Sequence, residues 1–352
     1  MRTLDLPSSR ATVSVSIIDS TACAYNLPCA NLFWPPFKGL HTLDICSYAF
    51  LLRHGTGDEC RHVLFDLGIR KDWQNLVPSM VSRLKEWDAT IKVETHVADI
   101  MQKQGLDLAR IEAIVWSHLH WDHTGDPSTF PPTTKLIVGP GVKDRYMPGW
   151  PKVDDAGFRE SDIANRQVVG LESEDFDKTV GGFKAHDYFG DGSLYLLDAP
   201  GHALGHLNAL ARTSAEPESF VFLTADSVHL GGEIRLSDAL PLPDPVEVPG
   251  IVPCPCPAAD LTNIHPLHSA TKPFLGLDPS FPEHLEDAEH TIELIQKFDA
   301  DERVFVIFSH DTSIYDVVDF FPNTADDWRL KDWKKRGMWT FLTHLQKTAR
   351  AD

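Results

Sequence analysis

Hydrophobic and polar positions alternate along this chain in short stretches that predict β-strands. Residues 11–18 alternate strictly, and the apolar runs 43–54 and 60–68 flank the turn 55–59, as expected of a β-hairpin. Further short apolar runs predict strands at 111–116, 134–139, 192–202, 219–226 and 303–311. The stretch 192–202 is expected to end in a turn. The chain is therefore expected to be rich in short, largely buried strands.

Helical spacing follows some of these strands. Apolar residues recur three and four positions apart over 93–104, where Gly105 would end the helix, and over 282–298. Strands followed by helices, twice over, predict layered α/β architecture. The proline- and aromatic-rich stretch 27–39 is expected to be a stiff surface loop. Residues 227–280 show little periodicity and many prolines, so we expect a loop-rich insertion within a single domain spanning 1–352.

Composition and charge narrow the classes of partner. The 352 residues are 42% hydrophobic and 24% charged, as in ordinary globular proteins, and the formal net charge is −19. The electrostatic field of so negative a protein repels nucleic acid and anionic membrane surfaces. No apolar run reaches the roughly 20 residues of a membrane span, and the N-terminus lacks the pattern of a signal peptide. We expect a cytoplasmic protein that acts on a small molecule, with the insertion forming either a pocket rim or a homodimer contact.

Candidate metal ligands stand where the predicted strands end. The segment SHLHWDHTGD at 117–126 follows one strand directly, and three later strands also lead into a histidine or an acid. Side chains at strand ends are held rigidly by the sheet but left accessible by the loops that follow. The candidates are His118, His120, Asp122, His123, His202, Asp226 and His310.

The order of these residues resembles the metallo-β-lactamase superfamily. Its signature is His-x-His-x-Asp-His, then Pro-Gly-His, then Asp, then a final His, and Asp66 in VLFDLG matches the early acid that supports the site. The resemblance implies a four-layer αβ/βα sandwich with two metals at one edge of the sheets. It implies a first metal held by His118, His120 and His202, a second held by Asp122, His123 and His310, and Asp226 bridging both.

The chemistry of these residue types agrees with that assignment. In an extended segment residues two apart point the same way, so His118 and His120 can bind one ion, while Asp122 and His123 turn towards another. Imidazole and carboxylate ligands suit Zn²⁺, although Mn²⁺, Fe²⁺ or Co²⁺ are possible. A water shared by two ions has its pKa lowered towards ~7 and becomes a hydroxide nucleophile. Asp122 is expected to pass its proton to the leaving group.

Within the superfamily the spacing most resembles the N-acyl-homoserine-lactonase-like branch, which includes fungal hydrolases of lactones and lactams. The implied reaction is dinuclear-zinc opening of a small cyclic ester or amide, such as an acyl-homoserine lactone or a benzoxazolinone-type γ-lactam. This branch often has a tyrosine three residues after the bridging acid, where this chain has His229. We expect His229 to donate a hydrogen bond to the substrate carbonyl. Candidates for a flat apolar substrate wall are Phe33, Trp34, Trp121 and Trp150.

Two other functions stay open. A thioesterase of glyoxalase-II type would need a cationic grip for its carrier, and no Lys/Arg cluster lies near the motifs unless Lys143 and Arg145 provide one. A metal-binding protein without turnover is the second alternative. At single positions, His206 competes with His202, and Asp311 with His310. The family pattern favours His202 and His310 as the ligands.

Overall fold

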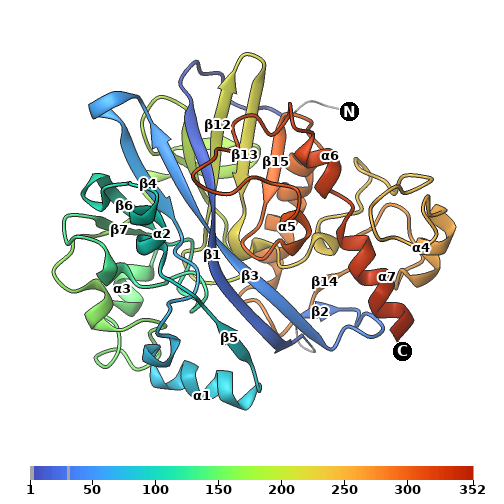
Figure 1. The fold of residues 1–352 in the computed structure, drawn as a ribbon, viewed down its shortest axis with the longest axis horizontal. Coiled ribbons are helices and arrows are strands. Elements are labelled where there is room, and N and C mark those ends of the chain that lie inside the picture. Colours follow the sequence, from blue (N-terminus) through green and yellow to red (C-terminus); the bar gives the residue numbers. More distant parts are fainter. Residues whose placement is uncertain (1–3, 30–31, 352) are drawn as a thin grey trace.

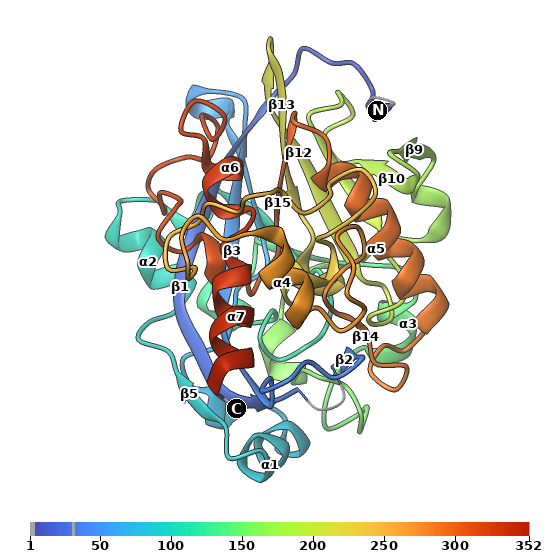
Figure 2. The same ribbon diagram turned by 90° about the vertical axis from the view of Figure 1, so that its right-hand side faces the viewer.

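The structure, a computed structural model that describes residues 4–29 and 32–351, contains two large β-sheets packed face to face (Figures 1 and 2). The first sheet has the strand order β5 (Thr90–Lys92), β1 (Val13–Pro28), β3 (Thr42–His54), β4 (Arg61–Phe65), β6 (Ile111–Val115), β7 (Lys135–Val138), β8 (Val168–Gly170). The second has the order β15 (Val304–Ile307), β13 (Glu218–Leu223), β12 (Leu207–Ala215), β11 (Leu194–Asp198), β10 (Phe183–Asp187), β9 (Lys178–Val180).

Helices cover the outer faces of both sheets. In Figure 1 α2 and α3 lie outside the first sheet and α5 lies outside the second. The helices are α1 (Pro78–Glu86), α2 (Val97–Lys103), α3 (Val142–Tyr146), α4 (Ala258–Ile264), α5 (Leu285–Asp299), α6 (Trp333–Gly337) and α7 (Phe341–Ala351). This helix–sheet–sheet–helix order confirms the predicted four-layer sandwich.

The layers follow from strands that are apolar on both sides. Phe50 of β3 packs between the two sheets, whereas its neighbour Leu51 packs on the outer face together with Met101 of α2. On the second sheet Phe222 of β13 faces outward against Phe298 of α5. Successive side chains of a strand point to opposite faces, so a strand buried on both sides reads as a nearly continuous apolar run.

The predicted hairpin and helices are present, with some changes of extent. β3 pairs antiparallel with β4, α2 lies within the predicted stretch 93–104, and α5 begins three residues after and ends one residue after the bounds of the predicted stretch 282–298. The prediction of a surface loop at 27–39 holds only in part, and residues 30–31 of that stretch lie outside the described residues. Phe33 and Phe37 are buried, and β2 (Phe33–Trp34) pairs with β14 (Gly276–Leu277), because the aromatic side chains of this stretch fill an apolar cluster beneath α7.

The stretch 227–280 is mostly irregular, as expected, but it is closely packed against its surroundings. It contains α4 and short 3₁₀ turns, and Leu236 and Phe274 share an apolar cluster with Phe341 of α7. Arg235 makes a buried bidentate ion pair with Asp299 at the end of α5, with N–O distances of 2.8 and 2.9 Å. No helix within the described ranges combines the length and apolarity needed to cross a bilayer.

The topology brings four chain segments to one edge of the sandwich. β4 runs parallel to β6, and β13 runs parallel to β15. β11 has the same direction as β13, because β12 between them is antiparallel to both. The loops that follow β6, β11, β13 and β15 therefore emerge at shared sheet edges, and these are the loops that carry the candidate ligands.

Candidate metal centre

The seven predicted ligands form two groups that share Asp226. His118, His120, His202 and Asp226 make the first group, and Asp122, His123, Asp226 and His310 make the second. Within each group the potential ligand atoms lie within 4.8 Å of one another. The structure thus brings together all seven side chains, in the grouping that the sequence pattern implied.

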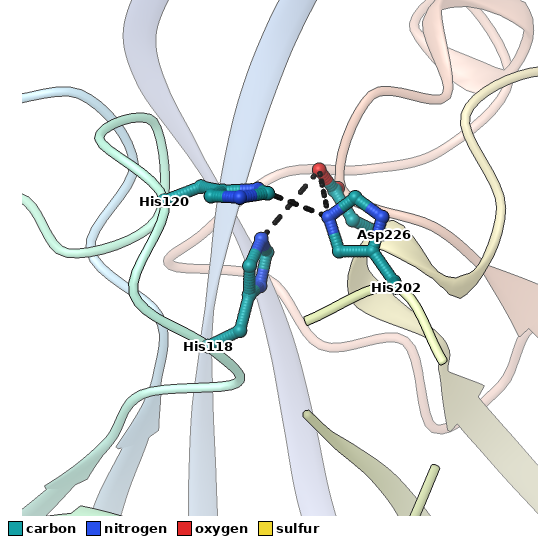
Figure 3. A group of neighbouring side chains, drawn as sticks. All are labelled: His118, His120, His202 and Asp226. Carbon is teal, nitrogen blue, oxygen red and sulfur yellow. Dashed lines mark hydrogen bonds and ion pairs between the residues drawn. The ribbon is translucent and has the colours of Figure 1, made fainter. Parts of the chain in front are cut away.

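In the first group three imidazoles surround one carboxylate, with His118 and His120 on the loop after β6 and His202 on the loop after β11 (Figure 3). His118 Nε2 lies 3.8 Å and His202 Nε2 lies 3.7 Å from Asp226 Oδ2. His120 Nδ1 lies 3.0 Å from His202 Nε2. His120 is half-buried and the other three are buried, so the group has one more accessible side.

The second group uses the other oxygen of the same carboxylate. His123 Nε2 and His310 Nε2 each lie 3.0 Å from Asp226 Oδ1, and His310 Nε2 lies 3.4 Å from Asp122 Oδ2. Asp226 therefore presents one oxygen to each group, as a carboxylate that bridges two ions must.

Buried atoms without partners show that the residues fit divalent cations. Among the described residues His118 Nε2, His123 Nε2 and Asp226 Oδ1 are buried and accept or donate no hydrogen bond. A buried polar atom left unpaired is costly, and a metal ion removes that cost. Burial lowers the pKa of His118 and of His202 far below the usual value, so both rings are neutral, as metal ligands are.

Asp226 is ionised despite its burial. Burial alone would raise the pKa of its carboxyl, but the rings of His123 and His310 hold that pKa well below the ordinary range. Histidine rings around one bridging carboxylate are the donor set of a two-metal site of hydrolytic type, in which each ring binds metal in its neutral form. This set fits divalent metal ions held in a pair.

A further set of contacts orients the ligand rings. Asp66 accepts hydrogen bonds from Ser117 N and Ser117 Oγ, both at 2.7 Å, and from His123 Nδ1 at 2.9 Å. His310 Nδ1 donates to the backbone carbonyl of Cys46 at 2.6 Å. These bonds fix the proton of each ring on Nδ1 and leave Nε2 free for a metal. Asp66 is thus placed where the family pattern puts its supporting acid.

His229 lies beside the first group. Its Nε2 is 3.5 Å from Asp226 Oδ2 and its ring centroid is 5.0 Å from that of His202. Buried Glu233, which sequence reasoning did not identify, accepts hydrogen bonds from the backbone N–H of His229 and of Leu230. Glu233 Oε1 also lies 3.7 Å from His229 Nδ1. The turn that carries His229 is therefore anchored on a buried carboxylate.

His206 and Asp311, the competing candidates, lie outside both groups. His206 is fully buried, with its ring centroid 4.9 Å from that of His118. The carboxylate of Asp311 accepts hydrogen bonds from the backbone N–H and the hydroxyl of Ser313, and it thereby caps the turn that follows. The structure is consistent with the preference for His202 and His310.

A third acidic group, Asp72, His96 and Asp126, lies elsewhere. The guanidinium of Arg70 occupies it, since Arg70 Nε is 2.8 Å from Asp72 and Arg70 Nη2 is 3.5 Å from Asp126. Its negative charge is thus offset by the buried guanidinium of Arg70.

The four predicted aromatic contacts are dispersed. Phe33 and Trp121 are buried in the apolar cluster beneath α7, Trp34 is 57% exposed on β2, and Trp150 lies under the guanidinium of Arg159 at 4.7 Å. Their role in substrate binding stays a prediction. The aromatic ring that contacts site histidines is Phe281, at 5.5 Å from the His202 ring and 5.2 Å from the His229 ring. No periodicity in the sequence marks it, because it lies in a turn ahead of α5.

Comparison with known proteins agrees with the fold and the ligand order. Residues 47–310 match the family described as the metallo-beta-lactamase superfamily. The chain is 40% identical over 348 residues to gamma-lactamase FDB1 of Fusarium pseudograminearum, covering 96% of this chain and 83% of that protein. It is also 40% identical over 353 residues to the monooxygenase mpaDE of Penicillium brevicompactum, covering 98% of this chain and 39% of that longer protein.

A solved structure shares the fold. It is an AiiA variant of B. thuringiensis with N-decanoyl-L-homoserine bound at its active site, and it superposes with a TM-score of 0.59 at 17% identity. The match covers 89% of this chain and 99% of that one. The predicted resemblance is confirmed, and the chain belongs to the metallo-beta-lactamase superfamily of hydrolases.

Proposed function

We propose that this protein is a dinuclear zinc hydrolase that opens small cyclic amides or esters, with γ-lactams as the preferred class. The observation that carries the proposal is the pair of ligand groups that share Asp226 and leave buried ring nitrogens unpaired. The name of the gamma-lactamase relative, which matches nearly the whole chain, supports the choice of a lactam.

Zinc is the metal that the ligand set favours. Each group offers three imidazoles, or two imidazoles and a carboxylate, in addition to Asp226. Histidine nitrogen and carboxylate oxygen suit Zn²⁺, whereas Mg²⁺ or Ca²⁺ would favour oxygen ligands. When bound, two such ions would supply Lewis-acid polarisation of a carbonyl and would lower the pKa of a water molecule to about 7.

The residues of the site would contribute to catalysis in three ways. The burial of the ligands excludes bulk water and strengthens each electrostatic interaction in the site. Asp122, whose Oδ2 faces His310, would hold the second ion with one oxygen and pass a proton to the leaving nitrogen or oxygen with the other. His229, held by Glu233, would donate a hydrogen bond to the substrate carbonyl.

The thioesterase alternative finds less support. Lys143 and Arg145 lie in α3, and the guanidinium of Arg145 is engaged with Asp155. The non-catalytic alternative also finds less support, because relatives that match nearly the whole chain are named as a gamma-lactamase and a metallo-hydrolase.

A substrate panel tests the proposal. Zinc-loaded protein is incubated with an aryl-fused γ-lactam, an acyl-homoserine lactone, a β-lactam and a thioester, and ring opening is followed by chromatography. We expect the fused γ-lactam to be opened with the highest kcat/KM. Turnover of the thioester alone would overturn the proposal.

Two variants separate catalysis from binding. Asp122→Asn should abolish turnover, whereas a mere binding protein would keep its ligand affinity. His229→Ala should lower kcat/KM by roughly 10²-fold, the effect of losing one hydrogen-bond donor to a developing oxyanion. His265→Ala is the matched control, since His265 is a buried histidine of the same insertion whose Nε2 donates to the carbonyl of Lys272 and whose Nδ1 accepts from the backbone N–H of Leu267. An unchanged kcat/KM in His229→Ala would remove its role.

A further inference from the structure

We infer that Phe281 is a specificity-determining residue that selects substrates with an aryl ring fused to the lactam or lactone. This inference rests on the proposed function and adds to it the residue that recognises the apolar part of the substrate. None of the four aromatic residues named from the sequence has this position.

Phe281 lies where a substrate held at the metal centre would present its ring. Its side chain is half-buried and packs against two site histidines, tilted by 50° to His202 and edge-on, at 81°, to His229. His202 is a candidate ligand of the first metal, and His229 is the candidate carbonyl donor. A carbonyl between these two histidines would therefore have the Phe281 ring beside it.

Phe281 lines a narrow recess together with the site residues His202, Asp226 and His229. The recess has a volume of about 10 Å³, room for about one water-sized group such as a carbonyl oxygen. An aryl ring fused to the lactam or lactone would therefore stay outside the recess, next to the Phe281 side chain that lines it.

The position of Phe281 is fixed by its backbone. Phe281 N donates to the carbonyl of Asp278, and Asp278 N donates to the carbonyl of Leu32, both at about 3 Å. On the other side His284 N donates to the carbonyl of Gly201 at 2.9 Å, directly before ligand His202. The turn is thus tied to the loop that carries a metal ligand, so the ring is held in place before substrate binds.

The chemistry of the contact distinguishes aromatic from saturated substrates. Aromatic pairs in offset or edge-to-face arrangement gain about 0.5–1.5 kcal/mol beyond the area that they bury. That gain corresponds to a two- to tenfold preference. A monocyclic lactam has no aromatic ring to place against Phe281 and would not gain it.

The test compares Phe281→Leu with Phe189→Leu as a matched control. Phe189 is also half-buried and also stacks on a histidine, His54, at 4.2 Å between ring centroids, but that histidine is not a candidate ligand. For each zinc-loaded protein kcat/KM is measured on an aryl-fused γ-lactam and on a monocyclic γ-lactam. We expect the ratio of the two to fall two- to tenfold in Phe281→Leu alone, and to be retained in Phe281→Tyr.

A binding measurement keeps this inference separate from the proposed function. Calorimetry on zinc-loaded Asp122→Asn, in which turnover should be abolished, measures affinity for the fused lactam, and this affinity should be weaker when Phe281→Leu is added to that variant. If wild type opens no lactam or lactone, the proposed function fails, while weaker binding by Phe281→Leu still supports the contact. An unchanged ratio or unchanged binding in folded Phe281→Leu overturns the inference, as does a loss of preference in Trp34→Leu instead.

Discussion

Replacing Asp66 by asparagine should weaken the second metal site without disturbing the fold. Asp66 is fully buried and has a positive φ of 59°, a conformation that asparagine adopts as readily as aspartate. Its Oδ1 accepts from Ser117 N, while its Oδ2 accepts from Ser117 Oγ and from His123 Nδ1. The substitution keeps the shape of the side chain and changes one oxygen into a donor.

The expected magnitude follows from the hydrogen bonds. If the amide oxygen keeps the bond from Ser117 N, the amide nitrogen then faces His123 Nδ1, and two donors oppose each other. His123 would have to move its proton to Nε2, the atom that points towards Asp226 Oδ1 at 3.0 Å. That proton competes with a metal, so we expect a 10- to 100-fold loss of affinity, typical of changes to the residues behind metal ligands.

The assay is a zinc titration of metal-free protein in competition with a chromophoric chelator. Asp326→Asn is the matched control, because Asp326 also accepts from a serine hydroxyl, Ser14 Oγ at 2.7 Å, and from a backbone N–H, Val15 N at 2.9 Å, but contacts no metal ligand. We expect two tight sites in Asp326→Asn and one weakened site in Asp66→Asn. Two sites of wild-type affinity in Asp66→Asn would refute the orienting role of Asp66.

Three other outcomes are expected. Arg235→Ala should lower the free energy of unfolding by about 3–5 kcal/mol, since it leaves the buried carboxylate of Asp299 without its cation. Urea denaturation measures this free energy, and a loss below about 1 kcal/mol would contradict the prediction. Gly201→Ala should lower the melting temperature far more than Gly105→Ala, although both glycines have positive φ. A Cβ at Gly201 would lie 2.1 Å from the backbone nitrogen of Ala288, whereas a Cβ at Gly105 would have none of the described atoms within 4 Å. Similar losses in the two variants would exclude the close contact between this loop and α5. Chelation of the metals should abolish ring opening and lower the melting temperature, both reversed by added zinc, because an ion that binds the folded state stabilises it; a chelated protein of full activity would exclude metal catalysis.

Sequence reasoning located the candidate ligands because their signal is local. Each ligand lies in the loop that follows a short apolar run, and strands of the same direction end at the same edge of a sheet. The spacing within 117–126 also decides which side chains can point together, since Asp122 and His123 follow the extended pair of His118 and His120 at once. The layered fold follows similarly from strands that are apolar on both faces.

The tertiary structure alone decided which aromatic ring meets the site. Phe33, Trp34, Trp121 and Trp150 were named for their residue type, but residue type does not say whether a ring is buried in a core or turned towards a ligand. Phe281 reaches His202, which is 79 positions away, because the turn ahead of α5 is bonded to the carbonyl of Gly201. Such a contact depends on how distant segments pack, and periods of two or 3.6 residues carry no information about it. The sequence by itself thus determined the candidate metal ligands and the layers, whereas packing decided which residues lie beside the candidate metal centre.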